Sequence, residues 1–155
     1  MRRSFALAAA LVALLLLVPY EARLRAAVAL LNQTAQASAN TTSVTTTAIS
    51  TTGATLIVVC LTSYEIQTEP TVSDSQTNTW TALTQSVRTG QFRTKLHYVL
   101  NPSTSGSHTF TASSGVATYP VLGVMAFSGT LTSGAFDKEA GGNNAVTSRA
   151  GSRAG

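Results

Sequence analysis

The sequence predicts an antiparallel two-layer β-sandwich, immunoglobulin-like or jelly-roll-like, and three observations lead to it. Residues 54–64 form the most apolar and β-branched run outside the N-terminus, without a polar residue from 56 to 61. The run is too short to span a membrane as a helix and is typical of a buried strand. Strand-like segments follow at intervals of about ten residues, with turn residues between them. After residue 33, no segment has the apolar spacing of a helix.

Composition agrees with a β-protein. The chain has 155 residues, enough for one domain of ordinary size. Charged residues make up 10%, which excludes a coiled coil and a charged disordered chain, whereas Thr and Ser make up roughly a quarter. Four of the ten basic residues and one of the six acidic residues lie in residues 1–27, so the +4 charge falls to +1 without them. With no basic cluster left, nucleic acid is not an expected partner.

The N-terminus has the features of a secretory signal. Arg2 and Arg3 precede an apolar stretch at residues 5–18, and Pro19 ends it. A retained membrane anchor over residues 1–27 is the first alternative. A pilin-type assembly helix is the second, but it needs a longer unbroken apolar helix. The expected localisation is secreted or at the cell surface, with membrane contact only if residues 1–27 are retained.

The early segments leave two alternatives open. Residues 26–33 read as a strand or a short helix, and residues 43–49 as an edge strand or part of a hydroxyl-rich linker. Residues 71–81 predict a hairpin whose turn contains Asp74 and Asn78, because Asp and Asn favour turns.

The later segments also read as strands, at residues 80–87, 107–112 and 117–128. Residues 91–100 alternate as in a half-buried antiparallel strand. One face carries Phe92, Leu96, Tyr98 and Leu100, and the other carries Arg93, Lys95 and His97. The expected organisation is a signal or anchor over residues 1–27, the sandwich over residues 28–133 and a flexible Gly-, Ala- and Ser-rich tail over residues 134–155.

Two of the expected strands are apolar on both faces. In a two-layer sandwich each strand has one face toward solvent, yet residues 54–64 and 120–127 have few polar side chains on either face. If they are neighbours in one sheet, their outer faces form an apolar patch that a monomer rarely leaves exposed. This predicts an oligomer or capture of another surface protein, for which an open sheet edge offers a second route.

No catalytic, cofactor or metal signature is present. Asp74 and Asn78 are the candidates for metal ligands, but two oxygen ligands are too few and turn capping is the expected role. His97 and His108 are single histidines without neighbouring ligands, and Cys60 is expected in the core. Four aromatic residues are candidates for ligand binding by stacking on sugar rings, although core packing is the usual role. They are Tyr64, Trp80, Tyr98 and Tyr119.

The order of these motifs resembles a type of β-sandwich domain found in secreted and surface proteins of environmental bacteria, usually without an assigned activity. The resemblance covers roughly residues 28–137, implies the fold alone, and in such domains further strands follow. The residues that carry it are those at 51–59, 72–80, 96–102, 108–110, 127–129 and 136–137. An acidic residue and Tyr often precede the Ser-Gly in such domains, where this chain has Ala126 and Phe127.

These observations predict a secreted, non-enzymatic β-sandwich with a structural or adhesive role, which associates with itself or joins an extracellular assembly. The alternative is a carbohydrate-binding module that uses exposed aromatic residues to bind a glycan. An enzyme of unrecognised type is a third reading, with no residues assigned to it.

Overall fold

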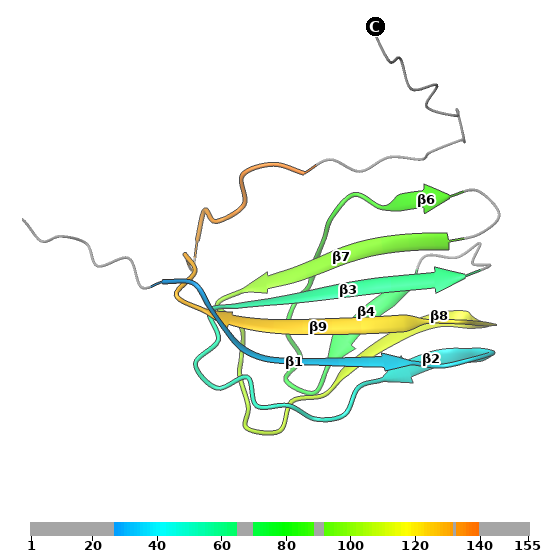
Figure 1. The fold of residues 1–155 in the computed structure, drawn as a ribbon, viewed down its shortest axis with the longest axis horizontal. Helices are drawn as coiled ribbons and strands as arrows, with labels where there is room; N and C mark the ends of the chain where they lie inside the picture. The colour runs from blue at the N-terminus through cyan, green and yellow to red at the C-terminus, as the bar shows by residue number, and fades with distance from the viewer. Residues whose placement is uncertain (1–26, 65–69, 89–91, 132, 140–155) are drawn as a thin grey trace, which may run out of the picture.

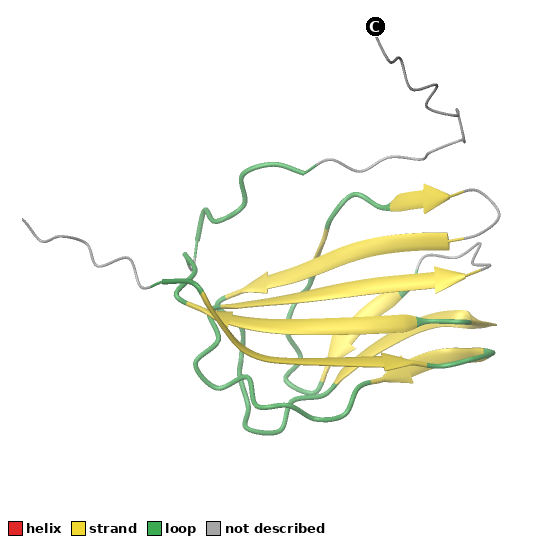
Figure 2. Ribbon diagram, viewed as in Figure 1, coloured by secondary structure: helices red, strands yellow, loops and turns green. Residues whose placement is uncertain are grey.

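Two antiparallel sheets pack together in this protein, and the prediction of an all-β chain is confirmed (Figure 1). This computed structural model describes residues 27–64, 70–88, 92–131 and 133–139. Within those ranges the chain forms strands, turns and loops and no helix (Figure 2). Residues 1–26 of the expected signal or anchor and residues 140–155 of the expected tail lie outside the described residues.

The larger sheet has six strands. They are β1 (Ala29–Ala37), β3 (Leu56–Tyr64), β5 (Thr81–Ala82), β6 (Ser86–Arg88), β7 (Phe92–Leu100) and β9 (Val121–Ser128). Their order is β1-β9-β3-β7-β5, and β6 also pairs with β7. β3 therefore lies in the centre, with β7 on one side and β9 on the other. The smaller sheet consists of β2 (Thr41–Thr45), β8 (Phe110–Thr118) and β4 (Thr71–Asp74), in the order β2-β8-β4.

The core lies between the two sheets and is organised around β3. Alternate residues of this strand, Ile57, Val59 and Leu61, are at most 2% exposed. Burial of one such side chain contributes about 1.5–3 kcal/mol, which explains why the most apolar run of the sequence takes the central position. The remaining buried apolar residues are Val44, Ala54, Val99, Phe110, Ala112, Leu122, Val124 and Ala126.

The two early segments that the sequence left open both contribute to strands. Residues 26–33 contribute to β1, which pairs with β9 at the edge of the larger sheet. Residues 43–49 contribute to β2, which pairs with β8 at the edge of the smaller sheet. Ile49 continues this edge through an isolated bridge to His108.

The predicted hairpin at residues 71–81 is wrong. β4 pairs with β8 in the smaller sheet, whereas β5 pairs with β7 in the larger one. The turn residues are where the sequence places them, but the chain uses this turn to cross from one sheet to the other. Turn chemistry is local and does not determine which strand pairs with which.

Other boundaries also differ. The expected strand at residues 117–128 is divided, because β8 continues to Thr118 and β9 begins at Val121. Tyr119 and Pro120 connect the two strands. The expected strand at residues 80–87 appears as the short β5 and β6.

β7 alternates as predicted, but its apolar side faces outward. His97 and Val99 lie opposite Val59 and Ile57 of β3, and are 5% and 9% exposed. Phe92 and Leu96, on the other side, are 48% and 39% exposed. A period of two separates the faces of a strand without stating which one is buried. Here the register with β3 turns the more polar face of β7 inward.

Candidate functional site

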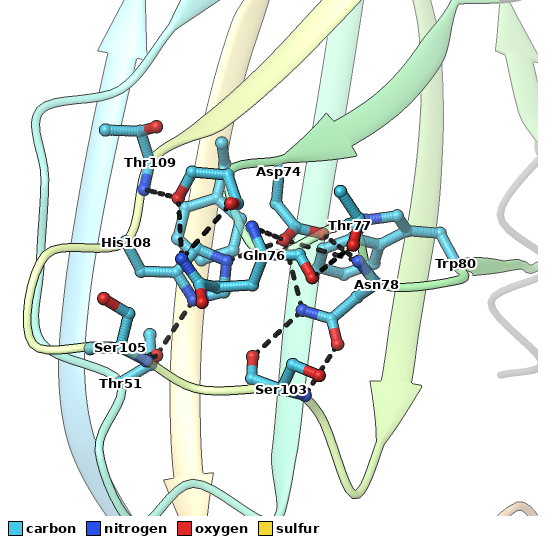
Figure 3. A network of polar contacts seen from close by, with 12 residues as sticks. Thr51, Asp74, Gln76, Thr77, Asn78, Trp80, Ser103, Ser105, His108 and Thr109 are labelled. Atoms are coloured by element: carbon cyan, nitrogen blue, oxygen red, sulfur yellow. Dashed lines mark hydrogen bonds and ion pairs between the residues drawn. The ribbon is translucent and has the colours of Figure 1, made fainter.

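A buried polar network joins three loops at one end of the sandwich (Figure 3). Its centre is the carboxylate of Asp74, the last residue of β4, whose side chain is 0% exposed. This carboxylate first closes the turn that follows β4. It accepts hydrogen bonds from the backbone N–H groups of Gln76 (2.7 Å) and Asn78 (3.2 Å) and from Nδ2 of Asn78 (3.1 Å). The turn-capping role expected for Asp74 is what the geometry shows.

The same carboxylate also holds two ring nitrogens. Nε2 of His108 lies 2.9 Å from Oδ1, and Nε1 of Trp80 donates to Oδ2 at 2.8 Å. A carboxylate accepts hydrogen bonds, so Nε2 is the donor. Since His108 precedes β8 and Trp80 precedes β5, Asp74 ties one sheet to the other. The ring of Phe110 lies against both partners, 4.2 Å from the His108 ring and 6.1 Å from that of Trp80.

On its other side, His108 contacts a hydroxyl. Its Nδ1 lies 2.9 Å from Oγ1 of Thr51. A hydroxyl, an imidazole and a carboxylate in this order form the arrangement that activates nucleophiles in hydrolases. Thr51 and His108 are both 0% exposed, however, and Oγ1 of Thr51 also contacts the backbone N–H and carbonyl of Ser105. The Thr51 hydroxyl is thus closed off from solvent, and its hydrogen bonds hold the loops of Thr51, Ser105 and His108 together.

Asp74 and Asn78 lie together, as a shared site requires, but their oxygens are engaged. Both oxygens of Asp74 accept protein hydrogen bonds, and Oδ1 of Asn78 accepts one from the backbone N–H of Ser103 (2.7 Å). These oxygens are therefore occupied by hydrogen-bond donors and are not free to act as ligands for a cation. Among the described residues, no three His, Cys, Asp or Glu side chains are grouped to hold a metal ion.

The second feature is the side of the larger sheet that faces away from the smaller one. The side chains of β3 alternate between buried and half-buried, and the half-buried set points to this side. Its neighbours follow from the pairing register with β7 and β9. We call these residues the outer face: Leu56, Val58, Cys60, Thr62, Tyr64, Phe92, Thr94, Leu96, Tyr98, Leu100, Val121, Gly123, Met125 and Phe127. None of them is charged.

The outer face meets the condition stated for an apolar patch, namely that the two apolar strands are neighbours in one sheet. Residues 54–64 and 120–127 do supply neighbouring strands of one sheet, since β3 pairs directly with β9. The outward turn of β7 enlarges the apolar surface by Phe92, Leu96 and Leu100. Cys60 belongs to this face, half-buried, and not to the core between the sheets as expected.

A segment beyond β9 covers one corner of the outer face. We call residues 133–139 the strap. Its Phe136 stacks on Tyr98, with the ring centres 6.0 Å apart and the planes at 1°. The carboxylate of Glu139 accepts hydrogen bonds from the Thr84 hydroxyl (2.6 Å) and backbone N–H (2.8 Å). These hydrogen bonds hold the pKa of the Glu139 carboxyl below its ordinary value. Between the strap and the sheet lies an apolar pocket of about 270 Å³.

The four aromatic candidates do not form one platform. Tyr64 and Tyr119 lie 6.1 Å apart, and Phe92 joins them at 5.3 Å from Tyr64. Tyr98 is covered by the strap, and Trp80 is packed against the core. The Tyr64, Phe92 and Tyr119 rings are inclined at 54° and 65° to their neighbours, so they present no common flat surface.

Sequence reasoning missed the partnership of Asp74 with His108 and the docking of the strap. His108 is 34 residues from Asp74, and no local pattern links them. The nearest signal is that Asp74, Asn78, Trp80 and His108 are polar or amphipathic residues placed beside strand ends. The strap carried Phe136 as its only large apolar side chain in a Gly- and Ala-rich segment, which is a weak signal for docking.

Comparisons with protein-family models, with curated protein sequences and with solved structures each found no match. In the described part of the chain, no helix has the length and apolar character needed to cross a membrane.

Proposed function

We propose that this protein is a non-enzymatic structural or adhesive β-sandwich of the cell surface or an extracellular assembly, and that it binds another protein surface through the outer face. The observation that carries this proposal is the pairing of β3 with β9, which places two doubly apolar strands side by side. Monomeric proteins rarely expose a contiguous apolar patch of more than a few hundred Å².

The size of the face supports a protein partner. The three neighbouring strands of the outer face, each of about nine residues, spaced about 4.8 Å apart and rising about 3.4 Å per residue, cover roughly 440 Å² in projection. A stable protein–protein interface buries about 800 Å² on each partner. The strap and its pocket lie over the part of the face that contains Leu56, Val58, Leu96, Tyr98 and Leu100. The β9 side stays open to a partner, and its Val121 is 46% exposed.

The proposed location outside the cytoplasm is supported by the sequence. The basic and apolar pattern of residues 1–27 supports export or anchoring, and the resemblance to domains of secreted and surface proteins points the same way. The finer fold type, immunoglobulin-like or jelly-roll-like, belongs to this proposal too. The proposal needs no metal or cofactor, because binding depends on apolar contact alone.

Sugar binding is the less favoured function. Tyr64, Phe92 and Tyr119 do gather at one end of the outer face, and Phe92 and Tyr119 are each 48% exposed. Their mutual inclination makes them better suited to contacts with an irregular protein surface than to stacking on a flat sugar ring.

Replacing Leu96 with lysine tests the proposed function. Leu96 lies in the middle row of the outer face, on its β7 side, and is 39% exposed, so Leu96→Lys should leave folding intact while placing a charge in the interface. We expect a smaller fraction of the protein to stay with the cell surface or extracellular material, measured by fractionation and immunodetection.

The matched control is Val116→Lys. Val116 lies in β8 of the smaller sheet and is 46% exposed, so it receives the same charge on a different face. The free energy of unfolding of both variants should lie within about 0.5 kcal/mol of that of the natural protein. Equal retention of Leu96→Lys, Val116→Lys and the natural protein would contradict the proposal.

A further inference from the structure

We propose that the partner of the outer face is a second copy of this chain, packed about a twofold axis parallel to β3, with Leu96 of each copy seated over Gly123 of the other. This inference rests on the proposed function and specifies its partner. It follows from the order of side chains across three strands.

One row of residues crosses the middle of the outer face. Cys60 of β3 lies between Leu96 of β7 and Gly123 of β9 in the pairing register. Leu96 projects from the surface, whereas Gly123 has no side chain. The row therefore has a projection on one side of Cys60 and a depression on the other.

The depression at Gly123 is not required by this copy of the chain. A Cβ atom added there would meet only the carbonyl oxygen of Cys60, at 3.9 Å, which is an ordinary contact. Glycine inside a strand costs stability because of its backbone entropy. The pairing of β9 with β3 is regular at Gly123, without a bulge, and close approach of another surface is a known use of a glycine in a strand.

A twofold axis matches the projection to the depression twice. Rotation by 180° about an axis parallel to β3 and above Cys60 exchanges the β7 and β9 sides of the face. Leu96 of the second copy then comes over Gly123, and Leu96 of the first over Gly123 of the second. Such self-complementarity is what an isologous interface needs, and a different partner would not need it.

The flanking rows are compatible with the same pairing. In the next row Tyr98 and Met125 flank Val58, so a Tyr98 side chain would face a Met125 side chain. Methionine adapts its shape to irregular neighbours. No charged residue lies on the outer face, so the two copies bring no like charges together. Sheets that pack face to face are about 10 Å apart, which brings the two Cys60 side chains near each other.

The strap competes with the second copy. Phe136 occupies the surface of Tyr98 where Met125 of the second copy would lie. Association therefore requires the strap to leave this corner, and Phe136→Ala should strengthen the dimer. Weaker association of Phe136→Ala would place Phe136 in the interface and overturn this arrangement.

The test exchanges the projection and the depression. Gly123→Leu fills the depression and should weaken the dimer at least about tenfold in sedimentation velocity, with the unfolding midpoint of the dilute protein unchanged or raised. Adding Leu96→Ala to Gly123→Leu restores the fit with the two roles exchanged, and should recover most of the lost affinity. The protein is purified in the form in which cells accumulate it.

Gly106→Leu is the matched control, because Gly106 lies in a loop away from the outer face with open space around it. If Gly123→Leu does not fold, Gly123→Ala takes its place as the variant that fills the depression. A short bismaleimide that joins two Cys60 thiols gives a readout without substitution, and linked dimers are expected.

The remaining outcomes separate the two proposals. A protein that is monomeric at every concentration, or a dimer insensitive to Gly123→Leu, overturns the second copy as the partner. If Leu96→Lys still reduces surface retention in that case, the proposed function stands with a different partner. If Leu96→Lys has no effect either, both proposals fall.

Discussion

Asp74→Ala is expected to lower the free energy of unfolding by about 2–6 kcal/mol, because it leaves the ring N–H groups of His108 and Trp80 without an acceptor, at about 1–3 kcal/mol each. The carboxylate is fully buried and serves His108, Trp80 and the turn after β4. Alanine leaves all of these donors without an acceptor, and each unpaired buried polar group carries its own desolvation cost. The loss is large against a total stability of about 5–15 kcal/mol.

Urea unfolding of the purified protein measures this effect. Asp137→Ala is the control, because Asp137 is an exposed carboxylate of the strap and its removal should change stability by less than about 0.5 kcal/mol. Asp74→Asn keeps one acceptor oxygen but turns an N–H₂ group toward the other donors, so its loss should also be large. A loss below about 1 kcal/mol for Asp74→Ala would show that the network does not join the two sheets.

Phe110→Ala is expected to cost about 3–5 kcal/mol, the usual range for a buried Phe replaced by Ala. Phe110 is 0% exposed and begins β8, where it packs against the rings of His108 and Trp80. Its removal leaves a cavity beside the polar network and frees one side of the Trp80 ring. The core and the network should therefore be weakened together.

Trp80 is the only tryptophan of the chain, so its fluorescence reports on this site directly. We expect an altered emission of folded Phe110→Ala and a lower midpoint of unfolding. Phe110→Leu retains most of the apolar volume and should lose less. Equal losses in Phe110→Leu and Phe110→Ala would contradict the cavity as the cause.

The sequence was sufficient to predict the central strand and the apolar patch. Residues 54–64 are apolar at every position from 56 to 61, and a continuous apolar run of this length is typical of a buried strand. The apolar patch was predicted on the condition that residues 120–127 lie beside this strand, and the pairing of β9 with β3 meets that condition. The apolar character of both runs is local composition, which a sequence displays directly, whereas their pairing is not.

Long-range pairing could not be predicted in the same way. The alternation of β7 fixed two faces but not their direction, which the register with β3 decides. The turn at Asp74 was recognised, yet its chain crosses between sheets because β4 finds β8 as its partner. The contact of Asp74 with His108 joins positions far apart in the chain, so it emerges only once the sheets are assembled.

The labelling rate of the Cys60 thiol tests most directly whether the outer face is an interaction surface. Cys60 is the only cysteine of the chain and lies half-buried in the middle of this face. We predict slow labelling by a maleimide in the protein at the cell surface or at high concentration, and faster labelling after purification and dilution. Equal labelling rates under all these conditions would contradict the account, because they would show that nothing covers the outer face.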